Sequence, residues 1–234
     1  MNIKGLSVAM VQPKYSLNVG YVGRVMRNFG LDRLIIIGQK NLSASALTFA
    51  SHGRSIVQNA EHMSWSQLLA EFDFVIGTTA ITSNGRNPLR TTLTPERLER
   101  LNFDPFRSVL VLGRDTVGLT NQELASCDVV TSILTYTDYK TLNISHALSV
   151  ILYVLSRKGR IDQHRIIRRQ LRDVALTYID GLIMKSGFAE HKREELITIF
   201  KKLINESSLN EQQFSALLGL LRRVNIQLAN EGVW

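Results

Sequence analysis

Cysteine is almost absent from this sequence, proline is scarce, and there is no long apolar run. The one cysteine, Cys127, cannot form an intramolecular disulfide and cannot by itself build a zinc site. The short apolar start breaks at Gln12 and Pro13, and no run approaches the roughly 18 apolar residues that span a bilayer. With 44% hydrophobic residues, 21% charged residues and only 4 prolines in 234, the composition is that of a folded globular protein. We therefore expect a compact cytoplasmic protein, and we predict no metal site.

Positive charge predominates, with 28 Lys and Arg against 20 Asp and Glu and a formal net charge of +8. Lys and Arg that meet phosphates release condensed counterions, so a basic chain favours a polyanionic partner. A basic enzyme without such a partner can carry the same charge. The charge therefore favours nucleic acid without deciding for it.

Strand and helix patterns alternate through the first two thirds of the chain. Five short, mostly β-branched apolar runs have the pattern of strands buried on both faces: Leu6–Val11, Leu34–Ile37, Phe74–Ile76, Val109–Leu112 and Val129–Ile133. Helical stretches lie between and after them: Val19–Phe29, Trp65–Glu71, Pro95–Leu101, Asn121–Ser126 and Asn143–Ser156. Thr120 with Glu123 three residues on predicts a capping box for the fourth of these helices. The alternation predicts an α/β fold with a mostly parallel sheet.

The last third of the chain reads as helical throughout. Ile167, Leu171, Val174, Tyr178 and Leu182 mark one helix face. A second helix is expected over Glu194–Ile204, and Phe214 to Leu228 carries the apolar spacing of a third. The best boundary is the stretch 157–160 (RKGR), which contains a glycine and no apolar residue. We predict an α/β domain over residues 1–158 and a small all-α domain over 159–234.

Polar loops follow the first and fourth predicted strands, where α/β sheets bind ligands. The first loop, QPKYSLNVG, runs into a helix that Asn18 is expected to cap, with Arg24 more than a turn further on. The second, LGRDTVGLTNQEL, contains Gly113 and Gly118, which permit close backbone approach or positive φ. Neither loop contains G-x-G-x-x-G or a P-loop, so any cofactor must be held differently. Plain strand-to-helix turns with a surface arginine remain an alternative.

Two further features bear on chemistry. Ser145 and His146 are adjacent, but neighbours on a helix point in different directions and no third group orients the histidine, so a serine hydrolase is not expected. Basic residues could contact RNA phosphate in two places, a loop with Arg86 and Arg90 and a stripe at i, i+3, i+4 and i+7 formed by Arg165, Arg168, Arg169 and Arg172. A solvated loop and a solvated helix face are the alternatives.

Taken together, three stretches resemble the three signature motifs of the SPOUT superfamily of S-adenosylmethionine-dependent RNA methyltransferases. The sequence NVGYVGRVMRNFGL is similar to the first motif, VLVLGRDTVGLTNQEL to the second and DYKTLNISHALSVILY to the third. Within the superfamily, the sequences GLTN and DYxxLN resemble those of the TrmJ-like branch of tRNA 2′-O-methyltransferases, which act on nucleotide 32 of the anticodon loop. The likeness covers about residues 4–158.

This resemblance implies a deep trefoil knot at the end of the sheet domain, a homodimer whose site is completed across the interface, and tRNA as the substrate. By the same resemblance the cofactor would be bound by Thr78, Thr79, Ala80, Gly113, Ile133, Lys140, Thr141 and Leu142, largely through backbone groups. Arg24 matches the family's catalytic arginine, Tyr139 matches a tyrosine implicated near it, and Asn18 and Asn143 match the motif asparagines. The resemblance makes residues 1–158 the methyltransferase domain, with 159–234 expected to bind RNA or support the dimer. A guanidinium is a poor proton acceptor, so we expect Arg24 to position phosphate and polarise the hydroxyl.

One residue departs from the pattern, because the second motif usually reads GRE and Asp115 replaces the glutamate here. The carboxylate is one methylene shorter, and any support that it gives to Arg24 or to RNA must have adjusted. Two other functions stay open on the sequence. One is a SpoU-branch 2′-O-methyltransferase that acts on another tRNA or rRNA position, and the other is a cofactor-binding RNA-interaction protein without turnover.

Overall fold

The computed structural model describes residues 3–38, 43–81, 92–157, 167–207 and 209–230. The chain divides into two compact units, Met1–Asp162 and Gln163–Trp234. Each has a hydrophobic core of its own, and each is described separately. No helix among the described residues is both long and apolar enough to cross a membrane.

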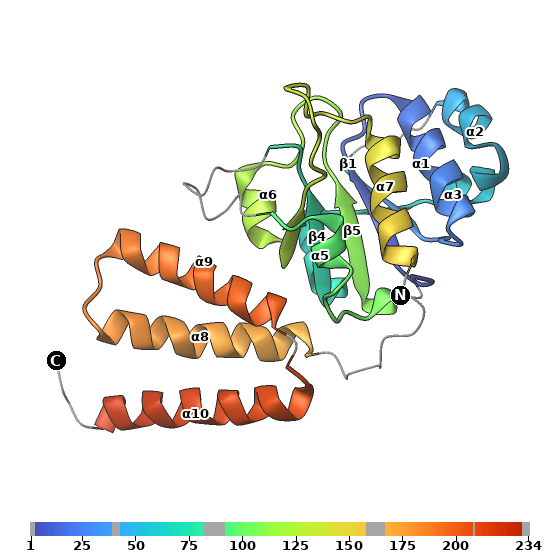
Figure 1. Ribbon diagram of the computed structural model, residues 1–234. Coiled ribbons are helices and arrows are strands. Elements are labelled where there is room, and N and C mark those ends of the chain that lie inside the picture. Colours follow the sequence, from blue (N-terminus) through green and yellow to red (C-terminus); the bar gives the residue numbers. More distant parts are fainter. Residues whose placement is uncertain (1–2, 39–42, 82–91, 158–166, 208, 231–234) are drawn as a thin grey trace. The chain divides into compact units, whose positions relative to one another are not determined.

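Unit 1 is built on a six-stranded sheet in the order β3-β2-β1-β5-β4-β6 (Figure 1). The strands are β1 (Ser7–Val11), β2 (Leu34–Ile37), β3 (Glu61–Met63), β4 (Phe74–Thr78), β5 (Ser108–Leu112) and β6 (Val129–Thr131). Every neighbouring pair in this order runs parallel, in registers such as Val8 opposite Leu34 and Ile76 opposite Leu110. The predicted parallel α/β fold is confirmed.

All five predicted strands are present, and the sheet has one more at its edge. Strand β3 pairs with β2, Ile35 lying opposite Glu61 and Ile37 opposite Met63. Its side chains are exposed or half-buried, so it carries no apolar run that a sequence pattern could reveal. Backbone pairing with β2 and the packing of the half-buried Met63 therefore hold this strand in the sheet.

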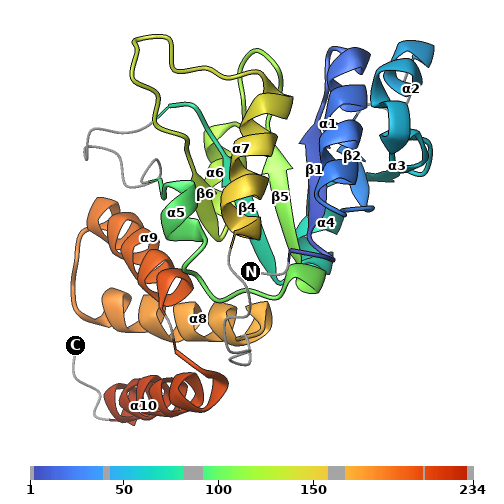
Figure 2. The same cartoon turned by 45° about the vertical axis from the view of Figure 1, so that its right-hand side comes forward.

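Helices cover both faces of the sheet, because alternate strand residues point to opposite sides. One face packs against α1 (Ser16–Asn28), α2 (Ala44–Ala50), α3 (Arg54–Gln58), α5 (Pro95–Leu98) and α7 (Ile144–Ser156). The other packs against α4 (Trp65–Glu71) and α6 (Asn121–Ser126). Helices α1 and α7 pack side by side (Figure 2). Short 3₁₀ turns, η1 (Ser51–Gly53) and η3 (Pro105–Arg107), complete the connections.

Unit 2 consists of three helices in its described residues, α8 (Arg169–Lys185), α9 (Glu190–Glu206) and α10 (Glu211–Asn230). Helix α8 packs against both of the others. Buried apolar side chains from all three, including Ile179, Ile204 and Phe214, form the core. Helices α9 and α10 extend at both ends beyond the apolar stretches that predicted them, because polar end turns carry no apolar signal, whereas α8 begins two residues after Ile167 and ends three residues after Leu182.

Candidate active site

Predicted cofactor-binding residues of unit 1 lie at or just after the carboxyl ends of neighbouring parallel strands. Parallel strands end at the same edge of a sheet, and β1, β5, β4 and β6 are neighbours in that order. Thr78, Thr79 and Ala80 close β4 or follow it, Gly113 follows β5, and Ile133 follows β6. The Thr79 amide donates to the Thr131 carbonyl at 3.1 Å, which ties two of these strand ends together. The topology thus gathers segments that lie far apart in the sequence.

Asn18, Asp115 and Asn143 form a chain of hydrogen bonds that joins the three motif segments. Asn18 Nδ2 donates to Asp115 Oδ1 at 2.5 Å, and Asn143 Nδ2 donates to Asn18 Oδ1 at 3.1 Å. An ionised carboxylate only accepts, so it fixes the Asn18 amide, which in turn fixes the Asn143 amide. Asn143 Oδ1 is left to accept from the Ser145 amide and hydroxyl, which caps α7.

This arrangement corrects the expected role of Asn18. Helix α1 begins at Ser16 with Tyr15 as its N-cap residue, so Asn18 lies in the first turn and is 7% exposed. The backbone amides of Lys14 and Tyr15 instead donate to Asp115 Oδ2, at 2.8 and 3.4 Å. A carboxylate from a distant loop therefore serves this helix end, which no local sequence pattern could show. Asp115 supports Asn18 and the loop before α1, and no recorded contact joins it to Arg24.

Arg114, next to Asp115, was not singled out from the sequence. Its guanidinium forms a two-bonded ion pair with Glu123 at 2.8 and 3.0 Å, and its Nε donates to Gln12 Oε1 at 2.7 Å. Glu123 also completes the predicted capping box with Thr120, which is confirmed. Burial opposes ionisation of Glu123, but the hydrogen bonds from Arg114 and the Thr120 amide outweigh it and lower the pKa of the carboxyl. Arg114 thereby joins α6 to the first motif loop.

The two glycines of the second motif have the backbone roles that the sequence suggested. Gly118 has a φ of 69°, in the left-handed region that favours glycine. A Cβ on Gly113 would lie 2.5 Å from the Gly118 carbonyl carbon, closer than real Cβ contacts. Gly113 therefore lets the loop fold back against the end of β5.

Two buried hydroxyls on either side of Ile133 lack hydrogen-bond partners. They are Ser132 Oγ and Thr135 Oγ1, in the segment that follows β6. Buried polar groups normally find partners, so unpaired ones favour a ligand with hydrogen-bonding groups. This fits the adenosine and amino acid groups of S-adenosylmethionine. Lys140, Thr141 and Leu142 are exposed in the same loop, where backbone groups can be reached.

Arg24 and Tyr139 both present their side chains to solvent. Tyr139 is 79% exposed, and Arg24 is exposed on α1. Among the described residues, no ion pair or hydrogen bond occupies the Arg24 guanidinium. Ser145 is 5% exposed and donates its hydroxyl to Asn143, as expected of a structural serine rather than a nucleophile.

The expected arginine stripe does not hold along its full length. Arg86, Arg90 and Arg165 lie outside the described residues. The Arg168 side chain is 62% exposed, 3.9 Å from Glu211, and that of Arg169 is 19% exposed. Arg172 is 5% exposed and donates to Asn205 at 2.7 Å, so its charge faces the interior of unit 2 instead of a phosphate. The side chain at the i+7 position, Arg172, points inward because it lies on the same face of α8 as the buried apolar residues.

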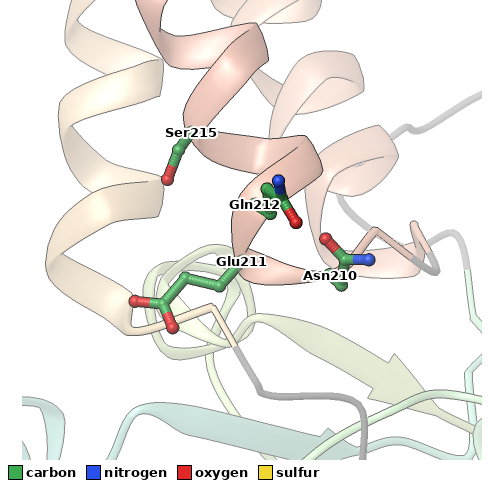
Figure 3. A pocket seen from close by; sticks show the side chains of 4 residues that line it. All are labelled: Asn210, Glu211, Gln212 and Ser215. Atoms are coloured by element: carbon green, nitrogen blue, oxygen red, sulfur yellow. The ribbon is translucent and has the colours of Figure 1, made fainter.

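A shallow cavity of about 400 Å³ at the start of α10 is lined by Asn210, Glu211, Gln212 and Ser215 (Figure 3). Asn210 and Gln213 exchange side-chain to backbone hydrogen bonds at 2.9 and 3.0 Å, which satisfies the first amides of the helix. None of the predicted site residues lines this cavity. No cluster of three or more His, Cys, Asp or Glu side chains suited to a metal ion occurs in the described part of the chain.

A family model, related sequences and solved structures all liken this chain to methyltransferases. Residues 5–153 match the model of the SpoU rRNA Methylase family. The tRNA (cytidine-2′-O-)-methyltransferase TrmJ of Methanocaldococcus jannaschii is 33% identical over 93% of this chain and 98% of its own length. The crystal structure of TrmJ from Z. mobilis ZM4 is 20% identical, covers 94% of this chain and 98% of that one, and gives a TM-score of 0.66. The SpoU methyltransferase AviRb from Streptomyces viridochromogenes, solved with the cofactor AdoMet, is 20% identical over 65% of this chain and 59% of its own, with a TM-score of 0.50.

Proposed function

Because the chain belongs to the SpoU rRNA methylase family, we propose that it is an S-adenosylmethionine-dependent tRNA ribose 2′-O-methyltransferase. The observation that carries the proposal is the hydrogen-bonded chain of Asn18, Asp115 and Asn143, which joins the three motifs at the carboxyl edge of the sheet. The TrmJ relative named above, similar along nearly its whole length, supports tRNA as the substrate. The target is nucleotide 32, a cytidine or uridine of the anticodon loop, and the enzyme acts in the cytoplasm.

The chain contributes positioning to this reaction. When bound, S-adenosylmethionine supplies an activated methyl group for transfer to the ribose oxygen. Thr78, Thr79, Ala80, Gly113, Ile133 and the loop residues Lys140, Thr141 and Leu142 form the cofactor site at the strand ends, with Ser132 and Thr135 offering unpaired hydroxyls. Holding two reactants in line converts an encounter into a unimolecular step, which accounts for much of the rate that such a site provides.

Arg24 is the residue that meets the RNA in this proposal. Its exposed guanidinium binds a phosphate beside the target nucleotide and polarises the 2′-hydroxyl. It does not accept the 2′-hydroxyl proton, because a guanidinium has only N–H donors and no acceptor atom. That proton passes to the neighbouring RNA phosphate or to water as the O–CH₃ bond forms. Tyr139, exposed in the third motif loop, contacts the same nucleotide.

A homodimer and a trefoil knot belong to the proposal as well. Exposed apolar side chains on α1 and α7, which are Leu17, Val150 and Tyr153, support a dimer. The knot is supported by the path of the chain, which leaves β6 at the sheet edge and returns as α7 beside α1. Unit 2 contacts tRNA through Arg165 and exposed residues such as Arg168, and it supports the dimer. Arg86 and Arg90 of unit 1 contact tRNA as well.

The test is transfer of labelled methyl from S-adenosylmethionine to unmodified tRNA transcripts, followed by mapping of the 2′-O-methyl group. Methylation at nucleotide 32 is expected. Methylation at another tRNA or rRNA position would move the protein to a different branch of the family. Cofactor binding without methylation of any RNA would instead favour a binding protein without turnover.

A further inference from the structure

Helix α1 lies unusually close to the segment that runs from α2 through η1 into α3. A Cβ on Gly20 would lie 2.9 Å from Phe49 Cβ, and one on Gly23 would lie 2.5 Å from Val57 Cγ2. From the other side, a Cβ on Gly53 would lie 2.7 Å from the backbone nitrogen of Arg24. Gly23 and Gly53 therefore meet backbone to backbone, and no larger residue fits at this contact.

Each glycine of this contact is followed in the sequence by an exposed arginine, Arg24 after Gly23 and Arg54 after Gly53. From the Gly53 geometry and standard bond lengths, the two arginine Cα atoms lie within about 10 Å of each other. Arginine side chains are long enough for both guanidinium groups to reach one site over that distance. The glycine contact thus brings Arg54 close to the proposed catalytic arginine.

The turn that delivers Arg54 has a strained backbone. Ser51, between α2 and η1, has φ of 50° and ψ of −120°. A residue other than glycine is held in such a region only at an energetic cost, and such positions cluster at functional sites. The chain changes direction at Ser51, and Gly53, two residues later, lies against α1.

Positive charge at this contact is not neutralised by the protein itself. Among the described residues, neither Arg24 nor Arg54 has an ion-pair or hydrogen-bond partner for its guanidinium, and His52 and Arg27 are exposed nearby in the sequence. Arg33, Arg107, Arg114 and Arg193, by contrast, each pair with a carboxylate. Adjacent like charges without counter-charges repel each other, and an anion removes that cost.

We propose that Arg54 is a second phosphate-binding residue, which together with Arg24 clamps the RNA backbone beside the target nucleotide. The inference rests on the proposed function for the identity of the RNA as tRNA. The planar guanidinium fork binds phosphate oxygens with two hydrogen bonds, so two such forks can hold a backbone in one orientation. Arg54 acts on binding, and Arg24 on both binding and the chemical step.

The experiment compares Arg54→Ala and Arg54→Lys with the wild type, and uses Arg100→Ala as the matched control. Arg100 is another exposed arginine of unit 1 that lies just past α5, and no residue in the described part of the chain pairs with its side chain. Binding of an unmodified tRNA transcript is measured at several salt concentrations, and kcat, KM and S-adenosylmethionine affinity are measured separately.

Arg54→Ala is expected to raise the Kd for tRNA about tenfold and to reduce the slope of log K against log salt by about 0.7 to 0.9. KM for tRNA should rise while kcat stays within about twofold, and cofactor affinity should not change. Arg54→Lys should restore the salt slope, because it restores the charge, but only part of the affinity. The Arg100→Ala protein should match the wild type.

An unchanged salt slope and Kd in Arg54→Ala would overturn the proposal, and so would an Arg54→Lys protein whose salt slope is as low as that of Arg54→Ala. Binding is read independently of turnover, which separates two kinds of failure. A wild type that binds tRNA and methylates none of it would remove the proposed function, while a reduced slope in Arg54→Ala would still establish the phosphate site. A wild type that binds no tRNA would overturn both.

Discussion

At the scale of single residues, the site depends on which atoms can donate hydrogen bonds and which can only accept them. Asp115 anchors the chain of hydrogen bonds because its carboxylate accepts from Asn18 and from the Lys14 and Tyr15 amides. The amide orientations of Asn18 and Asn143 both follow from that one charge. The aspartate thus performs a defined task with its shorter side chain.

Replacing Asp115 with asparagine tests this directly. The new amide can offer an oxygen to Asn18 or to the backbone amides, while its NH₂ group faces another donor. We expect Asp115→Asn to lower kcat at least tenfold, because a buried donor left unpaired costs about 1–3 kcal/mol and the Asn143 amide loses its fixed orientation. Steady-state kinetics with tRNA measure this, and a kcat equal to that of the wild type would contradict it.

Arg24 should separate binding of the cofactor from transfer of the methyl group. No recorded contact joins its guanidinium to another described residue, so Arg24→Ala should leave the fold and the S-adenosylmethionine affinity unchanged. Methyl transfer should fall by at least a hundredfold, as when a positioned charge is lost from a transition state. Calorimetric titration with cofactor and a labelled-methyl assay give the two readouts, and unchanged turnover would remove Arg24 from the mechanism.

At the scale of elements, sequence patterns found the helices and strands with long apolar repeats and missed several of the short ones. The strands from Ser7 to Thr131 that carry apolar runs were predicted, whereas β3 was not, since its residues Glu61 and His62 are exposed. Helices α2 and α3 were missed because they are short and are held against α1 by small residues such as Gly20. The Asn18–Asp115 contact spans 97 residues, so local spacing could place both residues in loops but could not pair them.

The α6 element should show a pH dependence that Arg114 and Glu123 set. The pKa of Glu123 is lowered in the folded protein, so its ionised form stabilises the fold. This stabilisation is fully present above the pKa of the unfolded chain, about 4.3, and is lost as the pH falls through the lower pKa of the folded protein. Glu123→Gln has no such charge to lose. We expect its free energy of unfolding to lie below that of the wild type at pH 7 and to approach it at acidic pH, as measured by urea unfolding across pH. A constant difference across pH would contradict this origin.

At the scale of the whole molecule, the apolar residues left on α1 and α7 carry the argument for a dimer. Tyr153 is 60% exposed and Val150 40% exposed on α7, and Leu17 is 38% exposed on α1. These two helices pack side by side on the sheet (Figure 2), so their outer faces can form one surface that a second copy would bury. The same surface includes the helix that carries Arg24.

Tyr153→Asp would place a charge on that surface, and we expect it to convert the proposed dimer to a monomer in sedimentation velocity experiments. An unpaired carboxylate is costly to bury, and loss of the aromatic ring removes contact area as well. If Arg24 of one subunit works beside the cofactor of the other, methyl transfer should fall in proportion to the monomer fraction and recover at high protein concentration. The control is Ala70→Asp. It puts the same charge on the exposed side of α4, which covers the opposite face of the sheet, and the variant should keep the oligomeric state and full activity of the wild type. A monomeric Tyr153→Asp protein with wild-type turnover would show that each subunit carries a complete site.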